Sequence, residues 1–122
     1  MNLINFLLRY IKETNIIIGY DSPIVSSIVG VIEDVLRRRG FNVKSSIYNP
    51  ETHFTILVVV VKPEIVSNGN FTVCITTIPE VKNITKKPTI VLSLREVALS
   101  INELMIGYKF FFKEDRDEKR TA

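Results

Sequence analysis

Between residues 15 and 48 the chain alternates a short apolar run, a long amphipathic segment and a second apolar run. The run 15–20 is too short for a helix and rich in β-branched residues, so it predicts a buried strand. The tripeptide Asp21-Ser22-Pro23 follows as a helix start. A side-chain oxygen can cap the first turn there, and proline lacks only an N–H that the first turn would leave unpaired.

The helix expected over 24–39 has apolar residues on one face: Ile24, Val25, Ile28, Val29, Ile32, Val35 and Leu36. Three arginines at 37–39 fall in the last turn, where cations favour the helix dipole. Gly40 then supplies a left-handed C′ position, and 41–48 resumes as a strand. A strand–helix–strand unit has a right-handed crossover by default, so we expect its two strands to be parallel.

Further apolar runs predict strands at 54–62, 71–78 and 89–92. The first of these is apolar almost throughout, which indicates burial on both faces of a sheet. Only residues 63–70 separate it from the next, which is short for a helical crossover. Because an Asn-Gly turn could also close a hairpin there, the direction of the strand at 71–78 stays open. We expect 79–88 to form a polar loop.

Helices are also expected near the two ends of the chain. Apolar residues at helical spacing predict a helix over 2–13, which we expect to cover one face of the sheet. Ser93 and Glu96 match a capping box, which predicts that a second helix starts there. Gly107 is expected to end that helix before a strand at 108–112, and a helix that continues to residue 112 is the alternative.

Strands that alternate with helices favour an α/β domain. We expect a single Rossmann-like or flavodoxin-like domain over residues 1–112, with a mostly parallel sheet of five or six strands and about three helices. The segment Lys113 to Arg120 carries four charges of each sign. We therefore expect 113–122 to be a charged, mobile tail.

Composition excludes several kinds of site. Cys74 is the single cysteine and His53 the single histidine, so one subunit holds no disulfide, no Cys-based zinc site and no His-rich metal centre. We expect no metal and no cofactor. The formal net charge is +3, and basic and acidic residues are interleaved along both halves of the chain. The chain has no glutamine and one cysteine, and a scarcity of thermolabile side chains is typical of heat-adapted proteins, although its nine asparagines argue the other way.

The chain also gives expectations about its location. No apolar stretch reaches the 18 or so residues of a transmembrane helix. The first eleven residues lack the basic region and the small-residue cleavage site of a signal peptide. We therefore expect a cytoplasmic protein.

In an open parallel sheet, ligands bind at the carboxyl ends of the strands, where the strand order reverses. The residues expected at this edge are the candidate ligand-binding set: Tyr20, Asp21, Ser22, Lys62, Thr77 and Ser93. Thr77, with Thr76, belongs to this set only if the strand at 71–78 is parallel. Helix N-termini after Ser22 and Ser93 suit an anion. Helix capping and solubility at a strand end explain the same residues without any ligand, and the glycine-rich phosphate motifs are absent.

We identify no catalytic constellation, so whether the chain is an enzyme stays uncertain, and a binding protein is favoured. A nucleophilic triad would need His53, which we expect at the opposite end of the sheet from Asp21. Cys74 falls in the middle of a predicted strand and is expected to be buried. The neighbouring carboxylates Glu33 and Asp34 are expected on the solvent face of a helix.

The leading interpretation is a small intracellular binding or interaction protein that acts as a homodimer. The N-terminal helix, the run Phe110 to Phe112 and an edge strand would otherwise leave apolar or unpaired surface exposed. The first alternative is a sensor for a nucleotide or another anionic small molecule at the carboxyl edge. The second is nucleic-acid binding through basic side chains: Arg37, Arg38, Arg39, Lys44, Lys82, Lys86 and Lys87.

Overall fold

The computed structural model describes residues 3–93, 95 and 96. Five strands form one sheet: β1 (Asn15–Tyr20), β2 (Asn42–Ile47), β3 (Phe54–Val59), β4 (Phe71–Thr76) and β5 (Thr89–Val91). Their order is β2-β1-β3-β4-β5, and every neighbouring pair is parallel. The expected α/β class is confirmed, with the flavodoxin-like order 2-1-3-4-5. The strand order reverses between β1 and β3.

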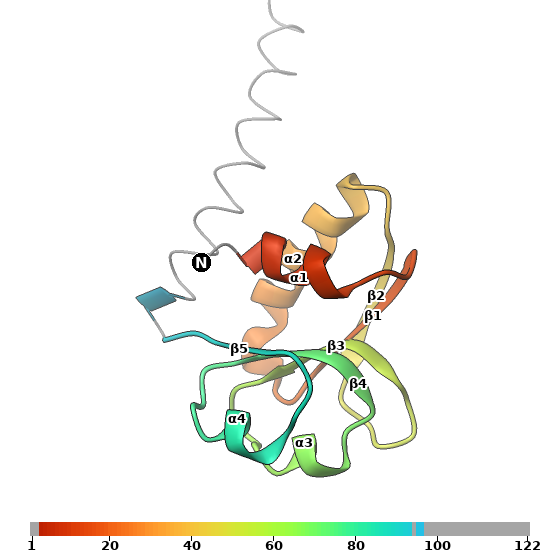
Figure 1. The fold of residues 1–122 in the computed structure, drawn as a ribbon. Helices are drawn as coiled ribbons and strands as arrows, with labels where there is room; N and C mark the ends of the chain where they lie inside the picture. The colour runs from red at the N-terminus through yellow and green to blue at the C-terminus, as the bar shows by residue number, and fades with distance from the viewer. Residues whose placement is uncertain (1–2, 94, 97–122) are drawn as a thin grey trace, which may run out of the picture.

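Helices cover both faces of this sheet unequally (Figure 1). α1 (Leu3–Tyr10) and α2 (Ser26–Arg38) lie on the first face, and a 3-10 turn, η1 (Pro23–Val25), leads into α2. On the second face lie two single-turn helices, α3 (Ile65–Asn68) and α4 (Val81–Ile84). The expectation that the N-terminal helix covers one face of the sheet is confirmed.

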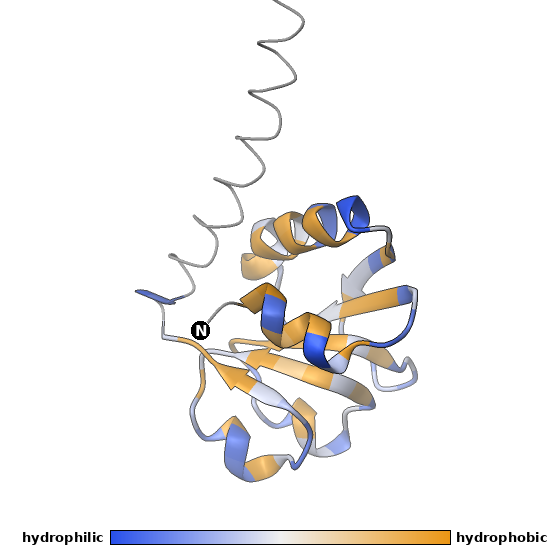
Figure 2. Ribbon diagram, turned by 45° about the horizontal axis from the view of Figure 1, so that its top comes forward, coloured by the Kyte–Doolittle hydropathy of each residue, from blue (hydrophilic) through white to orange (hydrophobic). Residues whose placement is uncertain are grey.

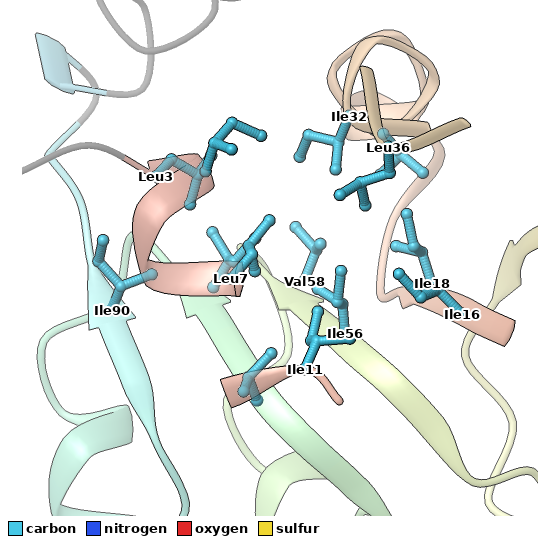
Figure 3. Packing of buried hydrophobic residues seen from close by; sticks show 14 of the residues in the cluster. Leu3, Leu7, Ile11, Ile16, Ile18, Ile32, Leu36, Ile56, Val58 and Ile90 are labelled. Atoms are coloured by element: carbon cyan, nitrogen blue, oxygen red, sulfur yellow. The ribbon is translucent and has the colours of Figure 1, made fainter. Parts of the chain in front are cut away.

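β3 is the centre of the core. All six of its residues are buried, as its apolar run predicted. Ile56 and Val58 pack under α1 and α2 with Leu7 and Leu36 (Figure 3), and alternate residues of β3 join the cluster under α3 and α4. β3 therefore contributes to two separate apolar layers, one on each face of the sheet.

Gly19 in β1 allows an aromatic ring to cross the second face. A Cβ atom at position 19 would lie 2.6 Å from Cδ1 of Phe54. Phe54 is fully buried and packs among the second-face residues, with its ring centroid 6.0 Å from that of Tyr48. Only glycine leaves room for this ring.

Two local signals in the sequence are confirmed. Gly40 has φ +97°, the left-handed conformation expected after a helix. The Ser93 Oγ accepts a hydrogen bond from the Glu96 amide at 3.0 Å, and Glu96 Oε2 accepts one from the Ser93 amide at 2.7 Å. These are the two reciprocal bonds of a capping box.

The connections between strands differ from the expectations in two places. β4 is parallel to β3, so the hairpin alternative is wrong. The crossover fits into a few residues because α3 is a single helical turn. The stretch 79–88 is likewise not only a loop, because it contains α4. Residues 107–112 and the tail 113–122, for which a strand or helix and a mobile tail were predicted, lie outside the described residues.

Several elements are shorter than expected: α1 ends at Tyr10 rather than at residue 13, and β4 ends at Thr76 rather than at residue 78. Two further differences have a physical reason. Ile24 was placed on the buried face of the helix, but its side chain is 78% exposed. The Ser22 cap starts a 3-10 turn at this point, and α2 itself begins only at Ser26. β3 ends at Val59 rather than at residue 62, because the next three amides turn towards a side chain. In the described part of the chain, no helix is long and apolar enough to cross a bilayer.

Candidate functional site

The strand order reverses at the carboxyl ends of β1 and β3, and Asp21 lies there. Its carboxylate is buried, with the residue only 5% exposed. Oδ2 accepts hydrogen bonds from the amides of Val60, Val61 and Lys62 at 3.0, 2.7 and 2.7 Å, and Oδ1 accepts a second from Val60 at 3.1 Å. The Asp21 amide in turn donates to Val58 O at 3.2 Å. One carboxylate thus joins the loop after β1 to the loop after β3.

These contacts change the chemistry expected at the reversal point. Three consecutive amides that converge on one position form the kind of backbone group that binds phosphate in other proteins. Here the group already holds an anion, the carboxylate of Asp21. A phosphate at this point would have to displace a covalently attached carboxylate and would be repelled by its charge. The crevice between β1 and β3 is closed by the protein itself.

Other polar residues of this edge also bond to their own chain. Ser22 Oγ accepts from the Ile24 amide at 3.3 Å. Thr76, which joins the edge because β4 is parallel, donates from Oγ1 to Val59 O at 2.7 Å and accepts from the Ile78 amide at 3.0 Å. Ser93 is engaged in its capping box. Capping and loop closure account for these hydroxyls without a ligand.

The structure brings only part of the candidate set together. Tyr20 and Asp21, at the end of β1, lie beside Lys62, whose amide binds Asp21. Thr77 and Ser93 follow β4 and β5, one and two strands further along the sheet. Ligand binding by these residues stays a prediction.

Sequence reasoning missed the exposed apolar side chains around this closed crevice. Ile24, Ile47 and Val61 are 78%, 51% and 56% exposed. Ile47 pairs with Tyr20 in the sheet, the Val61 amide bonds to Asp21, and Ile24 lies in η1 directly after β1. These three residues are called the carboxyl-edge patch below. No local pattern marks them, because Ile24 and Val61 adjoin runs that are otherwise largely buried and Ile47 is a single apolar residue at the end of β2.

The basic candidates lie elsewhere, mostly towards the amino ends of the strands. Arg37 forms an ion pair with Glu33 and donates from Nη2 to Val43 O at 2.9 Å. Lys87 donates from Nζ to Phe71 O at 2.6 Å, and its Nζ lies 4.7 Å from the centroid of the Phe71 ring. Arg37 and Lys87 are therefore tied to their own chain.

Arg37 also protects the open side of the sheet. The Asn42 amide donates to the carbonyl of Thr14, just before β1, and the Tyr48 amide donates to the carbonyl of Tyr20 in β1. The alternate backbone groups of β2, those of Val43 among them, therefore face outwards. The guanidinium of Arg37 occupies one such carbonyl, and Glu33 accepts a further hydrogen bond from Ser45 Oγ at 3.0 Å. A charged network of this kind discourages pairing with another strand at this half of the edge.

A hollow of about 540 Å³ opens at the amino ends of β1 and β2, opposite to the edge where a ligand was expected. Its lining combines strand residues with one helix side chain: Asn15, Ile16, Ile17, Asn42, Val43, Lys44 and Arg37. Two of these side chains are cationic.

Among the described residues, His53 and Cys74 are the candidates for a nucleophilic mechanism, and their surroundings constrain both. The His53 ring lies between Asn70 Oδ1 and Thr72 Oγ1, at 2.6 and 3.2 Å, at the amino ends of β3 and β4. Burial, with a smaller contribution from the negative charge of Asp21, raises the pKa of the Cys74 thiol to about 12. This thiol is protonated at neutral pH and is no nucleophile. Among the described residues, no group of three His, Cys, Asp or Glu side chains could hold a metal ion.

No family model, no curated protein and no solved structure matches this chain. The function therefore has to be argued from the residues themselves.

Proposed function

We propose that the protein is a non-catalytic binding protein that acts as a homodimer, and that the carboxyl-edge patch is where two copies meet. The observation that carries the proposal is the exposure of Ile24, Ile47 and Val61 around a crevice in which the Asp21 carboxylate is buried and bound by three amides. Apolar patches of this kind on soluble domains are typical of protein–protein contacts.

A second copy of the chain is the occupant that fits this surface best. A twofold contact brings the same residues of both copies together, so a patch with a central charge would face its own charge. The central polar group here, the Asp21 carboxylate, is buried and accepts hydrogen bonds from three amides, and the side chains exposed around it are aliphatic. Such a surface is complementary to itself.

The loops that carry the patch are also fixed before any contact forms. Asp21 bonds to the amides of residues 60–62, and Ser22 caps the turn that holds Ile24. A surface that is already ordered loses less conformational entropy when it binds. The hydrogen bonds of Asp21 thus order the dimer surface in advance, even though the same carboxylate obstructs a small anion.

The structural features that favour a homodimer differ from the sequence features that predicted one. The apolar face of α1 does not supply the contact, because Leu3, Leu7 and Ile11 are buried in the core of the same copy. The edge strand β2 is guarded in its first half by Arg37. The run Phe110 to Phe112 lies outside the described residues. The proposal therefore depends on the carboxyl-edge patch.

Sedimentation equilibrium of the full chain tests this proposal. We expect the wild type to approach twice the monomer mass of 13.9 kDa at tens of micromolar, roughly the range for an interface of modest size. Ile24→Asp and Val61→Asp should each give the monomer mass. Ile84→Asp is the matched control, because Ile84 is also exposed, at 43%, but lies on α4.

Two results would contradict the proposal. One is a wild-type chain that stays at 13.9 kDa up to about 100 μM. The other is an Ile84→Asp variant that dissociates as readily as Val61→Asp. Circular dichroism of each variant checks that a change in mass does not come from unfolding.

A further inference from the structure

The fold sorts charges that the sequence interleaves. Eight of the eleven described lysines and arginines lie towards the amino ends of the strands, namely Arg9, Lys12, Arg37, Arg38, Arg39, Lys44, Lys86 and Lys87. They come from the end of α1, the end of α2, the first half of β2 and the turn before β5. Every crossover returns the chain to this end of the sheet, and several cations lie just before a strand begins.

The balance with carboxylates makes this end basic. Four carboxylates share it, Glu13, Glu33, Asp34 and Glu51, so eight cations against four carboxylates give a net +4. The other described charges are Lys62, Lys82 and Arg95 against Asp21, Glu64, Glu80 and Glu96, a net −1. We call the eight cations the basic end. Lys82, grouped with Lys86 and Lys87 in the sequence, lies apart from them on α4.

Two contacts fix where the basic end lies. The Lys87 Nζ bonds to the carbonyl of Phe71, the first residue of β4. The Arg37 guanidinium bonds to the carbonyl of Val43, the second residue of β2. In Figure 2 the last turn of α2, which carries the arginines, is among the most hydrophilic parts of the ribbon.

Helix dipoles do not explain the whole arrangement. Cations in the last turn of a helix are favourable in themselves, which accounts for Arg9 and the arginines 37–39. Lys12, Lys44 and Lys86 follow no such rule, since each lies outside a helix. Their common position is a property of the folded surface.

We infer that the basic end binds the phosphate backbone of a nucleic acid duplex without reading its sequence. From β2 to β5 the sheet is four strand spacings wide, about 19 Å. A duplex carries one charge about every 1.7 Å along its axis, so several phosphates fit within this width. Lysine and arginine side chains reach phosphates without contacting base edges, so the contact is not specific for sequence.

The surroundings of the basic end favour a nucleic acid over other polyanions. A membrane surface or an acidic protein usually needs apolar anchors beside the cations. The most exposed large hydrophobics of the described residues, Ile24, Ile47 and Val61, lie at the carboxyl edge instead, while Tyr10, 36% exposed beside Arg9, is the large hydrophobic that adjoins the basic end. A homodimer that meets through that edge leaves the basic end free.

Fluorescence anisotropy with a labelled duplex of about two helical turns tests the inference on the full chain. The triple variant Arg39→Glu, Lys44→Glu, Lys86→Glu reverses three exposed cations of the basic end. The control variant Lys82→Glu, Arg95→Glu reverses two exposed cations that lie outside both the basic end and the carboxyl-edge patch. At about 50 mM salt we expect the first variant to lose at least about 100-fold in affinity and the control less than about 5-fold.

The salt dependence gives a second readout. Each lost phosphate contact lowers the slope of log K against log salt by about 0.9, so the basic-end variant should lose about 2.7 from the slope. The single variants Lys44→Gln and Lys86→Gln should each lose about 0.9, which keeps the test valid if the triple variant does not fold. Circular dichroism identifies that case.

Three results would overturn the inference. The first is a wild type that does not bind the duplex at about 50 mM salt. The second is a control variant that loses affinity in proportion to its change of net charge, which would assign binding to net charge alone. The third is tighter binding of the wild type to vesicles with anionic headgroups than to the duplex, which would identify a membrane surface as the ligand.

Discussion

Replacement of Asp21 by asparagine removes the charge from the most connected side chain of the carboxyl edge. The carboxylate accepts four hydrogen bonds from three amides, three of them at Oδ2. In Asp21→Asn the side-chain oxygen can keep the position of Oδ2. The NH₂ group of asparagine then takes the place of Oδ1. Two donors, this NH₂ group and the Val60 amide, face each other there.

The expected cost follows from these contacts. Hydrogen bonds to a charged acceptor contribute about 1.5–3 kcal/mol, against about 1 kcal/mol for neutral ones, and a donor that faces a donor is left unpaired. Val61 and Lys62 are exposed, so water can compensate in part at these two residues. We expect Asp21→Asn to lower the free energy of unfolding by about 2 kcal/mol and Asp21→Ala by about 3 kcal/mol.

Urea unfolding of the full chain, followed by circular dichroism, measures both values by linear extrapolation. Glu64→Gln is the matched control, because Glu64 is an exposed carboxylate just beyond the same loop, and we expect it to change stability by less than about 0.5 kcal/mol. The reasoning is refuted if Asp21→Asn is as stable as Glu64→Gln. That result would mean that the carboxylate does not hold the two loops together.

Other residues give further predictions. Gly19→Ala should destabilise the fold by about 1–3 kcal/mol in urea unfolding, because the added Cβ meets the Phe54 ring at 2.6 Å. Gly30→Ala in α2, with no atom within 4 Å, should stabilise it by up to about 1 kcal/mol, and equal effects of the two substitutions would contradict this packing. The buried Cys74 should react with a thiol reagent at pH 8 only in urea; rapid reaction in the native state would show that it is exposed. Because the pKa of Cys74 is raised from 9.0 to about 12, its contribution to stability is present below pH 9 and is lost as the pH rises towards 12. Cys74→Ala should therefore flatten the loss of stability in alkaline urea titrations.

Much of the fold could be predicted from local patterns. β1 and β3 are apolar runs of β-branched residues, and Gly40 and the Ser93–Glu96 pair are signals read within a few residues. The parallel direction of β1 and β2 follows from the handedness of one crossover. Each of these features depends on residues that lie close together in the sequence, so the local sequence is enough to predict it.

The rest depends on contacts between distant residues. Asp21 looked like a helix cap, but its partners are the amides 39 to 41 residues further along the chain. α3 and α4 have four residues each, too few for a helical period to be recognised. The basic end emerges only once all strands are parallel, since the direction of each crossover decides which charges share an end of the sheet.

Hydrogen exchange measured by mass spectrometry at two protein concentrations tests most directly whether the carboxyl edge joins two copies. Between about 1 μM and about 100 μM, we expect added protection in peptides that cover 21–26, 46–48 and 60–63, the segments of the carboxyl-edge patch. Peptides over 82–88 should exchange equally at both concentrations. Added protection confined to the basic end or to the first half of β2, or no change at any site, would contradict the account.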